Sequence, residues 1–406
     1  FFSAVSATYL GNLGLAPFFT VLGDATGIGV FSQWGTALTP APGTFLSGTL
    51  GTFLIGTGAI VLSIAILITG MRQYFRVQLV AMIIAFLGIF TLIAVLFTTS
   101  QESFVTSFNQ FTDNNLTYQA VIETARGAGW ADSESSLSTT LAFMVWPFYP
   151  LAFSIMSSSF AGEIKDVEKS QLYGMPGAVI TSAVLFILVT VGAYQTIGYD
   201  FLGAIGYNFY FAPEGATSAV PWIGLLGSIA SENLLLTILI GLAFVMWTWF
   251  WVPGCMLYGT RVMLAWSMDR VGPDALGNVS SKYNTPVTAT IVAGVMAELL
   301  LIAYIFVPAT QALVGIGAMG VSFAATGLGA IFFPYRRPEM FENSPVNYRV
   351  AGVPVMSILG LLTFGYMSLM VYYFFTDPLI GASNPIAIGI GVGVFVVAGL
   401  FYYGMR

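Results

Sequence analysis

Histidine is absent from this chain of 406 residues, and cysteine occurs once, as Cys255. A single cysteine excludes an internal disulfide and any metal cluster built on cysteine ligands. The absence of histidine removes the commonest metal ligand and proton relay, so a coupled proton would have to use carboxylates or lysine. The sequence also lacks HExxH, GxSxG and the GxxxxGK[ST] loop of nucleotide-driven pumps. It therefore predicts neither an enzyme nor an ATP-driven pump, and it predicts no cofactor and no metal.

Charge is equally scarce, because charged residues make up 7% of the chain, against roughly a quarter in ordinary globular proteins. The formal net charge is −6, and no basic cluster indicates a nucleic-acid partner. Hydrophobic residues, in contrast, make up 57% of the sequence, and the mean hydropathy is +0.86. Long apolar runs recur along the whole chain, which predicts an all-α, polytopic membrane protein whose main partner is the lipid bilayer.

The apolar runs predict about ten membrane segments, of which the first is incomplete. The run from 234 to 266 is too long for one straight crossing, so it must tilt, kink at Pro253 or extend beyond the bilayer. The chain begins inside an apolar run, which suggests part of a longer protein in which two further helices precede this one. The predicted segments are 1–22, 48–69, 77–97, 139–162, 177–197, 234–266, 287–307, 312–333, 352–375 and 385–403.

The distribution of lysine and arginine predicts the orientation. When the segments alternate in direction, eleven of the twelve basic residues fall on one side, and only Arg126 falls on the other. Basic residues are enriched on the cytoplasmic side of membrane proteins. The sequence therefore predicts a multi-pass protein of the cell membrane with its C-terminus in the cytoplasm.

The segment 139–162 is apolar throughout but contains Pro147 and Pro150. Each proline removes a backbone donor and clashes with the preceding turn of a helix. Unpaired backbone groups are tolerated within a bilayer only where they are buried in protein or line a polar pathway. Two half-helices that meet near the middle of the membrane can bind a small zwitterion. The alternative is a proline-kinked helix that only packs against its neighbours.

Three stretches resemble the amino acid–polyamine–organocation superfamily of secondary transporters. Residues 70–78 (GMRQYFRVQ) resemble the loop between the fourth and fifth helices of that family. Residues 146–150 (WPFYP), followed by 161–166 (AGEIKD), are similar to the break in its sixth helix and the charged exit from that helix. Residues 260–270 (TRVMLAWSMDR) and 283–286 (YNTP) resemble the end of its eighth helix and the start of its ninth.

This resemblance implies a LeuT-like inverted-repeat fold with about ten of twelve transmembrane helices present. Within a single transporter domain, 1–98 would be the remainder of the first repeat, 139–333 the second repeat, and 352–403 two C-terminal helices. The first helix of the family, which contributes to substrate binding, is not in this sequence. The glycine that the family carries in the sixth-helix break is Pro150 here, and the fifth-helix lysine of some proton-coupled relatives corresponds to Ala85.

The predicted substrate site combines the break with positions that the resemblance implies. Aromatic rings beside the break could cover a substrate or form a cation–π contact with its ammonium group, or they could simply pack. On the segment 234–266, Trp251 and Cys255 lie on one helical face, whereas Trp249 lies on another. The small residues on the implied opposite walls could instead allow close helix packing. The predicted substrate-binding residues are Trp146, Pro147, Phe148, Tyr149, Pro150, Trp251, Cys255, Ser6, Gly320 and Ser322.

Glu298 lies midway along the segment 287–307. A carboxylate within the bilayer has a high free-energy cost, so such a residue is a candidate for a functional role. It could couple transport to an ion, or it could make a structural hydrogen bond outside the central bundle. Glu163 and Lys165 follow the broken segment and could form a cytoplasmic gate or a solvated helix end.

The sequence as a whole favours a secondary active transporter that moves amino acids or related amines by alternating access. Aromatic and backbone groups dominate the predicted site, which favours a neutral or hydrophobic amino acid. The coupling ion, H⁺ or Na⁺, stays open, as does the oligomeric state. The alternative is a non-transporting receptor or complex subunit built on the same fold.

Overall fold

The computed structural model describes residues 1–41, 49–131, 136–211, 220–307, 310, 315–377 and 385–405. It divides into two compact units: unit 1 comprises Phe1–Ser133 and Ile155–Val307, and unit 2 comprises Glu134–Ser154 and Pro308–Arg406. The predicted starts of two membrane segments, at 48 and 312, lie outside the described residues. The division into inverted repeats stays a prediction.

The described residues confirm an all-α membrane architecture. They contain eight helical runs that are long and apolar enough to cross a membrane, or nine when one bent pair counts as a span. A shorter apolar helix, Gly391–Gly404, follows near the end of the chain. Every one of the ten predicted apolar segments thus coincides with a helix. Within the part of the chain that the structure describes, the strands are two short ones in unit 2.

Unit 1 begins with a 25-residue helical run, Phe2–Thr26, which is longer than the predicted 1–22. Its middle part, η1, is a π-helix rather than an α-helix. The elements of unit 1 and its boundary are, in order, α1 (Phe2–Tyr9), η1 (Leu10–Leu15), α2 (Ala16–Thr26), α3 (Gly29–Leu38), α4 (Leu50–Ile68), α5 (Met71–Thr98), α6 (Gln101–Phe111), α7 (Tyr118–Gly127), the 3₁₀-helix η2 (Phe153–Glu163), α10 (Val167–Thr196), α11 (Tyr199–Phe211), α12 (Ile223–Ser231), α13 (Leu234–Met268), η3 (Asp274–Gly277) and α14 (Val287–Phe306).

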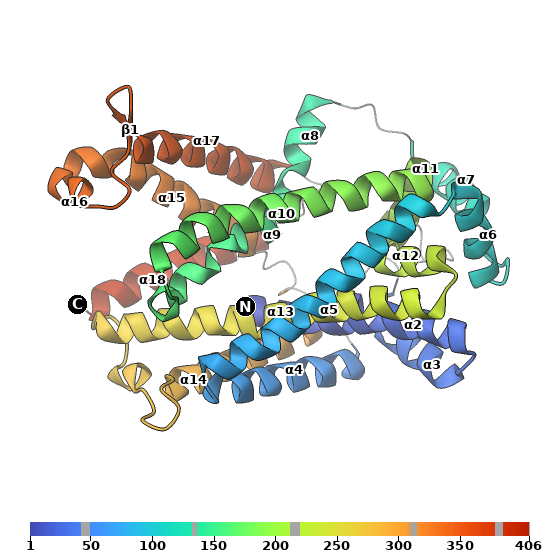
Figure 1. Cartoon of the computed structure of the whole chain (residues 1–406), viewed down its shortest axis with the longest axis horizontal. Coiled ribbons are helices and arrows are strands. Elements are labelled where there is room, and N and C mark those ends of the chain that lie inside the picture. Colours follow the sequence, from blue (N-terminus) through green and yellow to red (C-terminus); the bar gives the residue numbers. More distant parts are fainter. Residues whose placement is uncertain are drawn as a thin grey trace. The chain divides into compact units, whose positions relative to one another are not determined.

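The long helices α5 and α13 pack directly against each other in unit 1 (Figure 1). Glycine makes this approach close, because a Cβ atom on Gly88 of α5 would lie 2.2 Å from the backbone oxygen of Leu239 on α13. Helix α13 is one continuous helix of 35 residues with Pro253 inside it, and at 1.5 Å per residue it is about 52 Å long. It therefore exceeds the thickness of a bilayer core, as the sequence predicts.

The connections α4–α5, η2–α10 and α13–α14 lie at the same end of unit 1 (Figure 1). The first of them is very short, because Gly70 adopts a φ of +112° that side chains disfavour. The Thr285 hydroxyl donates to the Ile68 carbonyl at 3.1 Å and joins the α13–α14 connection to the end of α4. Arg72, Lys165 and other basic residues therefore belong to this end, which agrees with their predicted common side.

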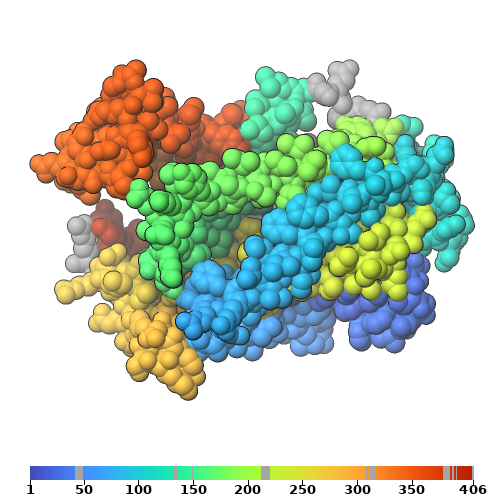
Figure 2. All heavy atoms as spheres, viewed as in Figure 1, coloured from blue at the N-terminus to red at the C-terminus, as the bar shows by residue number. Residues whose placement is uncertain are grey.

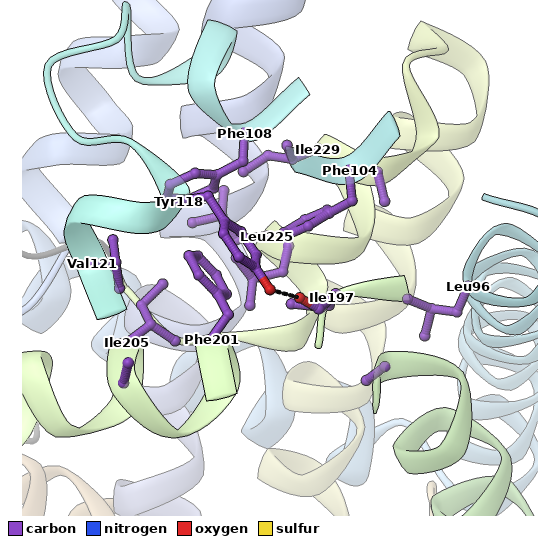
Figure 3. Close-up of a cluster of buried hydrophobic side chains, with 14 of the residues drawn as sticks. Leu96, Phe104, Phe108, Tyr118, Val121, Ile197, Phe201, Ile205, Leu225 and Ile229 are labelled. Carbon is purple, nitrogen blue, oxygen red and sulfur yellow. Dashed lines mark hydrogen bonds between the residues drawn. The ribbon is translucent and has the colours of Figure 1, made fainter. Parts of the chain in front are cut away.

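The opposite end of unit 1 carries a helical cap, formed by α6, α7, α11 and α12. These helices lie in 99–138 and 198–233, between the predicted apolar segments, so the apolar runs do not predict them. Phe104, Phe108 and Phe201 are fully buried there, and the ring of Tyr118 stacks on that of Phe201 at 4.3 Å (Figure 3). Figure 3 also shows the Tyr118 hydroxyl donating to the Ile197 carbonyl, at 2.9 Å.

Helices α5 and α10 lie at the surface in the space-filling view (Figure 2). Many of their exposed side chains are apolar. Only 11% of the most apolar stretch of α10 is buried within the protein. Ile180, Val184 and Ile187 are among its exposed side chains. Such surfaces are stable only against lipid or another apolar partner, so both helices meet the bilayer.

Unit 2 is built on the close packing of α15 against α17, where Gly327 and Gly360 let the two backbones touch. Its two strands form a short antiparallel hairpin in which Arg349 pairs with Pro354 and Val350 with Val353. Its elements are α8 (Leu137–Phe143), α9 (Val145–Ala152), α15 (Gly315–Arg336), α16 (Pro338–Glu342), β1 (Arg349–Val350), β2 (Val353–Pro354), α17 (Val355–Thr376) and α18 (Pro385–Met405).

Candidate functional site

The segment with the two prolines is a broken helix, as the sequence predicts. Two helical segments, Leu137–Phe148 and Pro150–Glu163, are joined by a bend. Beyond the bend, the α-helix α9 gives way at Phe153 to the 3₁₀-helix η2. Within η2, Phe160 leaves helical geometry altogether, with φ −121° and ψ 25°. The segment thus has backbone groups outside the regular α-helical pattern at several positions, which can serve a bound solute.

In unit 2, the aromatic residues of the break differ in their surroundings. Phe148 is buried, with its ring 6.2 Å from that of Phe323 on α15 and 6.4 Å from that of Tyr366 on α17. Trp146 is 45% exposed, and both prolines are partly buried. The side chain of Tyr149 lies outside what the structure describes. Phe148 therefore anchors the first half of the break to the core of unit 2.

The two predicted positions on α15 also differ. Gly320 is buried, and a Cβ atom there would lie 2.9 Å from Cγ2 of Val371 on α17. This glycine serves close helix packing, which is the second of the two roles that the sequence leaves open. Ser322 is exposed, and its hydroxyl donates to the Ala318 carbonyl at 2.9 Å within the same helix.

The remaining predicted residues lie on α1 and α13, which pack against each other in unit 1. Ser6 is buried on α1. Trp251 and Cys255 are partly buried on α13, one turn apart. Trp249 is buried in the core between these helices, so it packs, as its separate helical face predicts.

A buried polar contact that the sequence analysis omits joins the first span to α4. Asn12 lies in the π-helix and is fully buried, and its side-chain oxygen accepts a hydrogen bond from the Thr52 hydroxyl at 3.1 Å. The Thr49 hydroxyl caps α4 and donates to the Ala37 carbonyl at 3.3 Å. A π-helical turn is frequent at functional sites. The signal available in the sequence was a lone asparagine within an apolar run.

A second polar cluster joins α5 to the part of α13 just before Pro253. The amide nitrogen of Gln78 donates to the Tyr74 hydroxyl at 3.2 Å and to the Phe250 carbonyl at 3.0 Å. The amide oxygen of the same Gln78 is buried and has no hydrogen-bond donor among the described residues. Both side chains belong to the motif 70–78, but nothing in the sequence alone pairs them with α13.

The charged exit of the broken helix is tied to α13. Arg261 and Glu163 form an ion pair at 2.6 Å, with the arginine side chain 10% exposed and the glutamate side chain 35% exposed. Glu163 is thus paired with an arginine 98 positions further along the chain rather than with its sequence neighbour Lys165. A partly buried pair of this kind holds the end of η2 against α13.

Two other side-chain contacts hold η2 within unit 1. The ring of Phe160 lies 5.9 Å from that of Phe75 on α5. Ser157 exchanges two hydrogen bonds with Gln171 on α10, at 2.8 and 3.1 Å. None of the described residues of η2 is fully buried. The second half of the broken helix is thus attached through individual side chains rather than through a packed face.

Glu298 makes a specific hydrogen bond in the structure. The Thr57 hydroxyl on α4 donates to one carboxyl oxygen of Glu298 at 2.6 Å. The other carboxyl oxygen is buried without a partner among the described residues. This arrangement links α14 to α4, as the structural alternative for Glu298 predicts. Among the described residues, no three histidine, cysteine or acidic side chains gather in a way that could hold a metal ion.

Helices broken within the membrane are a recurring feature of secondary transporters. Comparison with known proteins identifies the family: the amino acid permease family model matches residues 1–397. The chain belongs to this family and is an amino acid–polyamine–organocation superfamily permease.

The chain is also similar to the branched-chain amino acid permease BcaP of Bacillus subtilis (strain 168). The two are 27% identical over 208 residues, which cover 50% of this chain and 40% of the relative. The matched part of the chain thus spans well under half of the relative's length.

Proposed function

We propose that this protein is a secondary active transporter that moves amino acids across the cell membrane by alternating access. The observation that carries the proposal is the bent helix at Pro147 and Pro150 in a chain that matches the amino acid permease family almost throughout. In this mechanism the substrate binds at the broken helix and becomes accessible to each side of the membrane in turn. A permease moves its solute unchanged, and the proposal therefore includes no enzymatic step.

The proposed substrate site comprises the backbone of 147–150 and the side chains of Trp146, Trp251, Cys255, Ser6 and Ser322, whereas Phe148 and Gly320 pack within unit 2. Aromatic and sulfur groups such as Trp146, Trp251 and Cys255 favour an apolar substrate side chain. The similarity to a branched-chain amino acid permease supports the same choice. We therefore propose a neutral, hydrophobic amino acid such as leucine as the substrate.

The orientation is part of the proposal. The end of unit 1 that carries Arg72 and Lys165 would face the cytoplasm, and the helical cap with Arg126 would face outward. The alternation of the predicted segments would place the C-terminus in the cytoplasm. Coupling to H⁺ or Na⁺ is proposed without a choice between the two ions, and Glu298 is the one candidate that the sequence analysis names for it.

The test is uptake of radiolabelled leucine by proteoliposomes that contain the purified protein. We expect saturable uptake that unlabelled isoleucine and valine inhibit and that lysine and glutamate do not. Imposed gradients of H⁺ or Na⁺, applied separately, identify the coupling ion. Leucine binding without any uptake or exchange would instead support the alternative, a non-transporting receptor or complex subunit.

Substitutions test the site within this assay. Trp146→Ala and Trp251→Ala should each raise the KM for leucine by about tenfold, because an aromatic contact to the substrate is lost. Trp266→Ala is the matched control, since Trp266 is exposed at the far end of α13. An unchanged KM in both site variants would reject the proposed site while leaving transport itself intact.

A further inference from the structure

The buried amide of Gln78 is the starting point. Its side chain is 5% exposed, and its nitrogen is fully used by the Tyr74 hydroxyl and the Phe250 carbonyl. The Phe250 carbonyl oxygen can only accept hydrogen bonds. If the oxygen and nitrogen of the Gln78 amide exchanged places, two acceptor oxygens would face each other with no hydrogen between them. The oxygen of Gln78 is therefore the atom that stays without a donor among the described residues. A buried acceptor of this kind is costly unless a donor reaches it.

Tyr74 supplies the complementary group. Its hydroxyl oxygen accepts from Gln78, and the hydroxyl hydrogen has no acceptor among the described residues in the contacts that the structure shows. Tyr74 and Gln78 are four positions apart on α5, so their side chains lie on one face of the helix. The face thus presents a hydrogen-bond donor and a hydrogen-bond acceptor side by side.

Gly254 lies beside this pair. A Cβ atom on Gly254 of α13 would lie 3.7 Å from the Tyr74 hydroxyl and 3.9 Å from Cε of Met156 on η2. Both are ordinary contact distances, so a longer side chain at 254 would extend toward the hydroxyl. The donor–acceptor pair therefore lies where α5, α13 and the second half of the broken helix come together in unit 1.

We propose that Tyr74 and Gln78 form a further subsite for the charged head of the transported amino acid, on the cytoplasmic side. The substrate's ammonium group would donate to the Gln78 oxygen, and its carboxylate would accept from the Tyr74 hydroxyl. The two groups of an α-amino acid are attached to the same carbon, which matches a donor and an acceptor on adjacent turns of one helix. Neither residue belongs to the substrate site proposed above. The cytoplasmic assignment follows from Arg72 and Arg76, which flank Tyr74 on the same helix.

This inference rests on the proposed function and on its orientation, and it predicts a one-sided effect. The experiment measures leucine uptake by membrane vesicles of known sidedness, prepared right-side-out and inside-out from cells that produce the protein. Gln78→Leu and Tyr74→Phe should each raise the KM at the cytoplasmic face by about tenfold, since each removes one hydrogen bond to a charged group. The KM at the outer face should stay within about twofold of that of the unchanged protein.

Gly254→Val tests the same space from the opposite helix. It should raise the cytoplasmic KM as well, because the larger side chain extends toward the Tyr74 hydroxyl. Gln73→Leu is the matched control, since Gln73 lies on α5 but is exposed. Detergent-solubilised samples of each variant should elute as the unchanged protein does in size-exclusion chromatography, which shows that they fold.

Two results would overturn the subsite. One is an unchanged cytoplasmic KM in folded Gln78→Leu and Tyr74→Phe, and the other is an equal rise at both faces. Absence of leucine uptake by the unchanged protein would be a failure of the proposed function instead. The two failures are thus distinguishable within one set of vesicles.

Discussion

The helical cap and the 3₁₀-helix η2 belong to the same unit but are held in opposite ways. In the cap, the rings of Phe104, Phe108 and Phe201 are fully buried against one another. Helix η2 has no fully buried residue among those described, and individual contacts to α5, α10 and α13 hold it. Burial of apolar area stabilises a region cooperatively, whereas single polar contacts add little each.

The two regions therefore differ in how they can move. A packed cap can only move as a body, because its side chains fill one another's space. A helix held by separate side chains can detach with a small change in free energy, which is typical of segments that move during function. The difference predicts a rigid cap and a movable second half of the broken helix.

The largest expected effect is on the stability of the cap. Phe201→Ala should lower the free energy of unfolding by about 3–5 kcal/mol, because it removes a fully buried ring from among three others. Thermal unfolding of the detergent-solubilised protein measures the change. Phe211→Ala is the control, since this residue ends the same helix and is 65% exposed. Equal destabilisation by the two variants would contradict the account of the cap.

The next effect concerns the polar contacts inside the cap. Tyr118 donates to the Ile197 carbonyl and accepts from the Gln101 amide at 3.0 Å. Tyr118→Phe should therefore lower the free energy of unfolding by about 1–2 kcal/mol, because the two bonds are lost. Chemical or thermal unfolding near neutral pH tests this, with Tyr173→Phe on the exposed face of α10 as the control.

The same tyrosine predicts a dependence on alkaline pH. Burial raises the pKa of Tyr118 above its ordinary value of 10.0, and the hydrogen bond from Gln101 offsets part of the rise. The folded protein then holds this proton more tightly than the unfolded chain, so its contribution is complete below about pH 10 and is lost as the pH rises further. Unfolding curves that fall equally for the unchanged protein and for Tyr118→Phe above that pH would contradict this prediction.

A smaller effect on stability is expected at η2. Glu163→Gln removes the charge partner of Arg261 and should lower the free energy of unfolding by only about 1 kcal/mol, because the glutamate is partly exposed. Its effect on mobility should be larger: trypsin should cleave after Lys165 several times faster than in the unchanged protein. The exchanged pair, Glu163→Arg with Arg261→Glu, should restore slow cleavage after Lys165, which mass spectrometry of the fragments distinguishes from cleavage after the new arginine.

The control for this experiment lies in unit 2. Glu342→Gln removes an exposed ion pair with Arg349, at 2.5 Å, and should leave cleavage after Lys165 unchanged. If Glu163→Gln also left the cleavage rate unchanged, the ion pair would not be what holds η2.

The smallest expected effect is at Glu298. Glu298→Gln keeps an oxygen that can accept from Thr57, so both the unfolding free energy and leucine uptake should stay close to those of the unchanged protein. Uptake at several external pH values, with and without an imposed proton gradient, is the measurement. A variant that is folded but has lost its response to that gradient would instead assign ion coupling to this carboxylate.

Much of this protein follows from its sequence alone. The length of each apolar run determines which segments are helical, because a bilayer leaves a backbone no other way to satisfy its hydrogen bonds. Pro147 and Pro150 determine the broken helix in the same way, since neither can donate to the turn before it. The three stretches at 70–78, 146–166 and 260–286 together indicate the family, which the family-model match over residues 1–397 confirms.

Only the tertiary structure reveals the cap, the partners of the polar residues and the attachments of η2. Phe104 and Phe201 come from segments that look like loops in the sequence, and they form a core because distant helices cover them. Gln78 meets Phe250, and Glu163 meets Arg261, across separations that local patterns do not encode. The reason is physical: periodicity reports what each helix must bury, whereas the neighbour that buries it depends on how the whole chain packs.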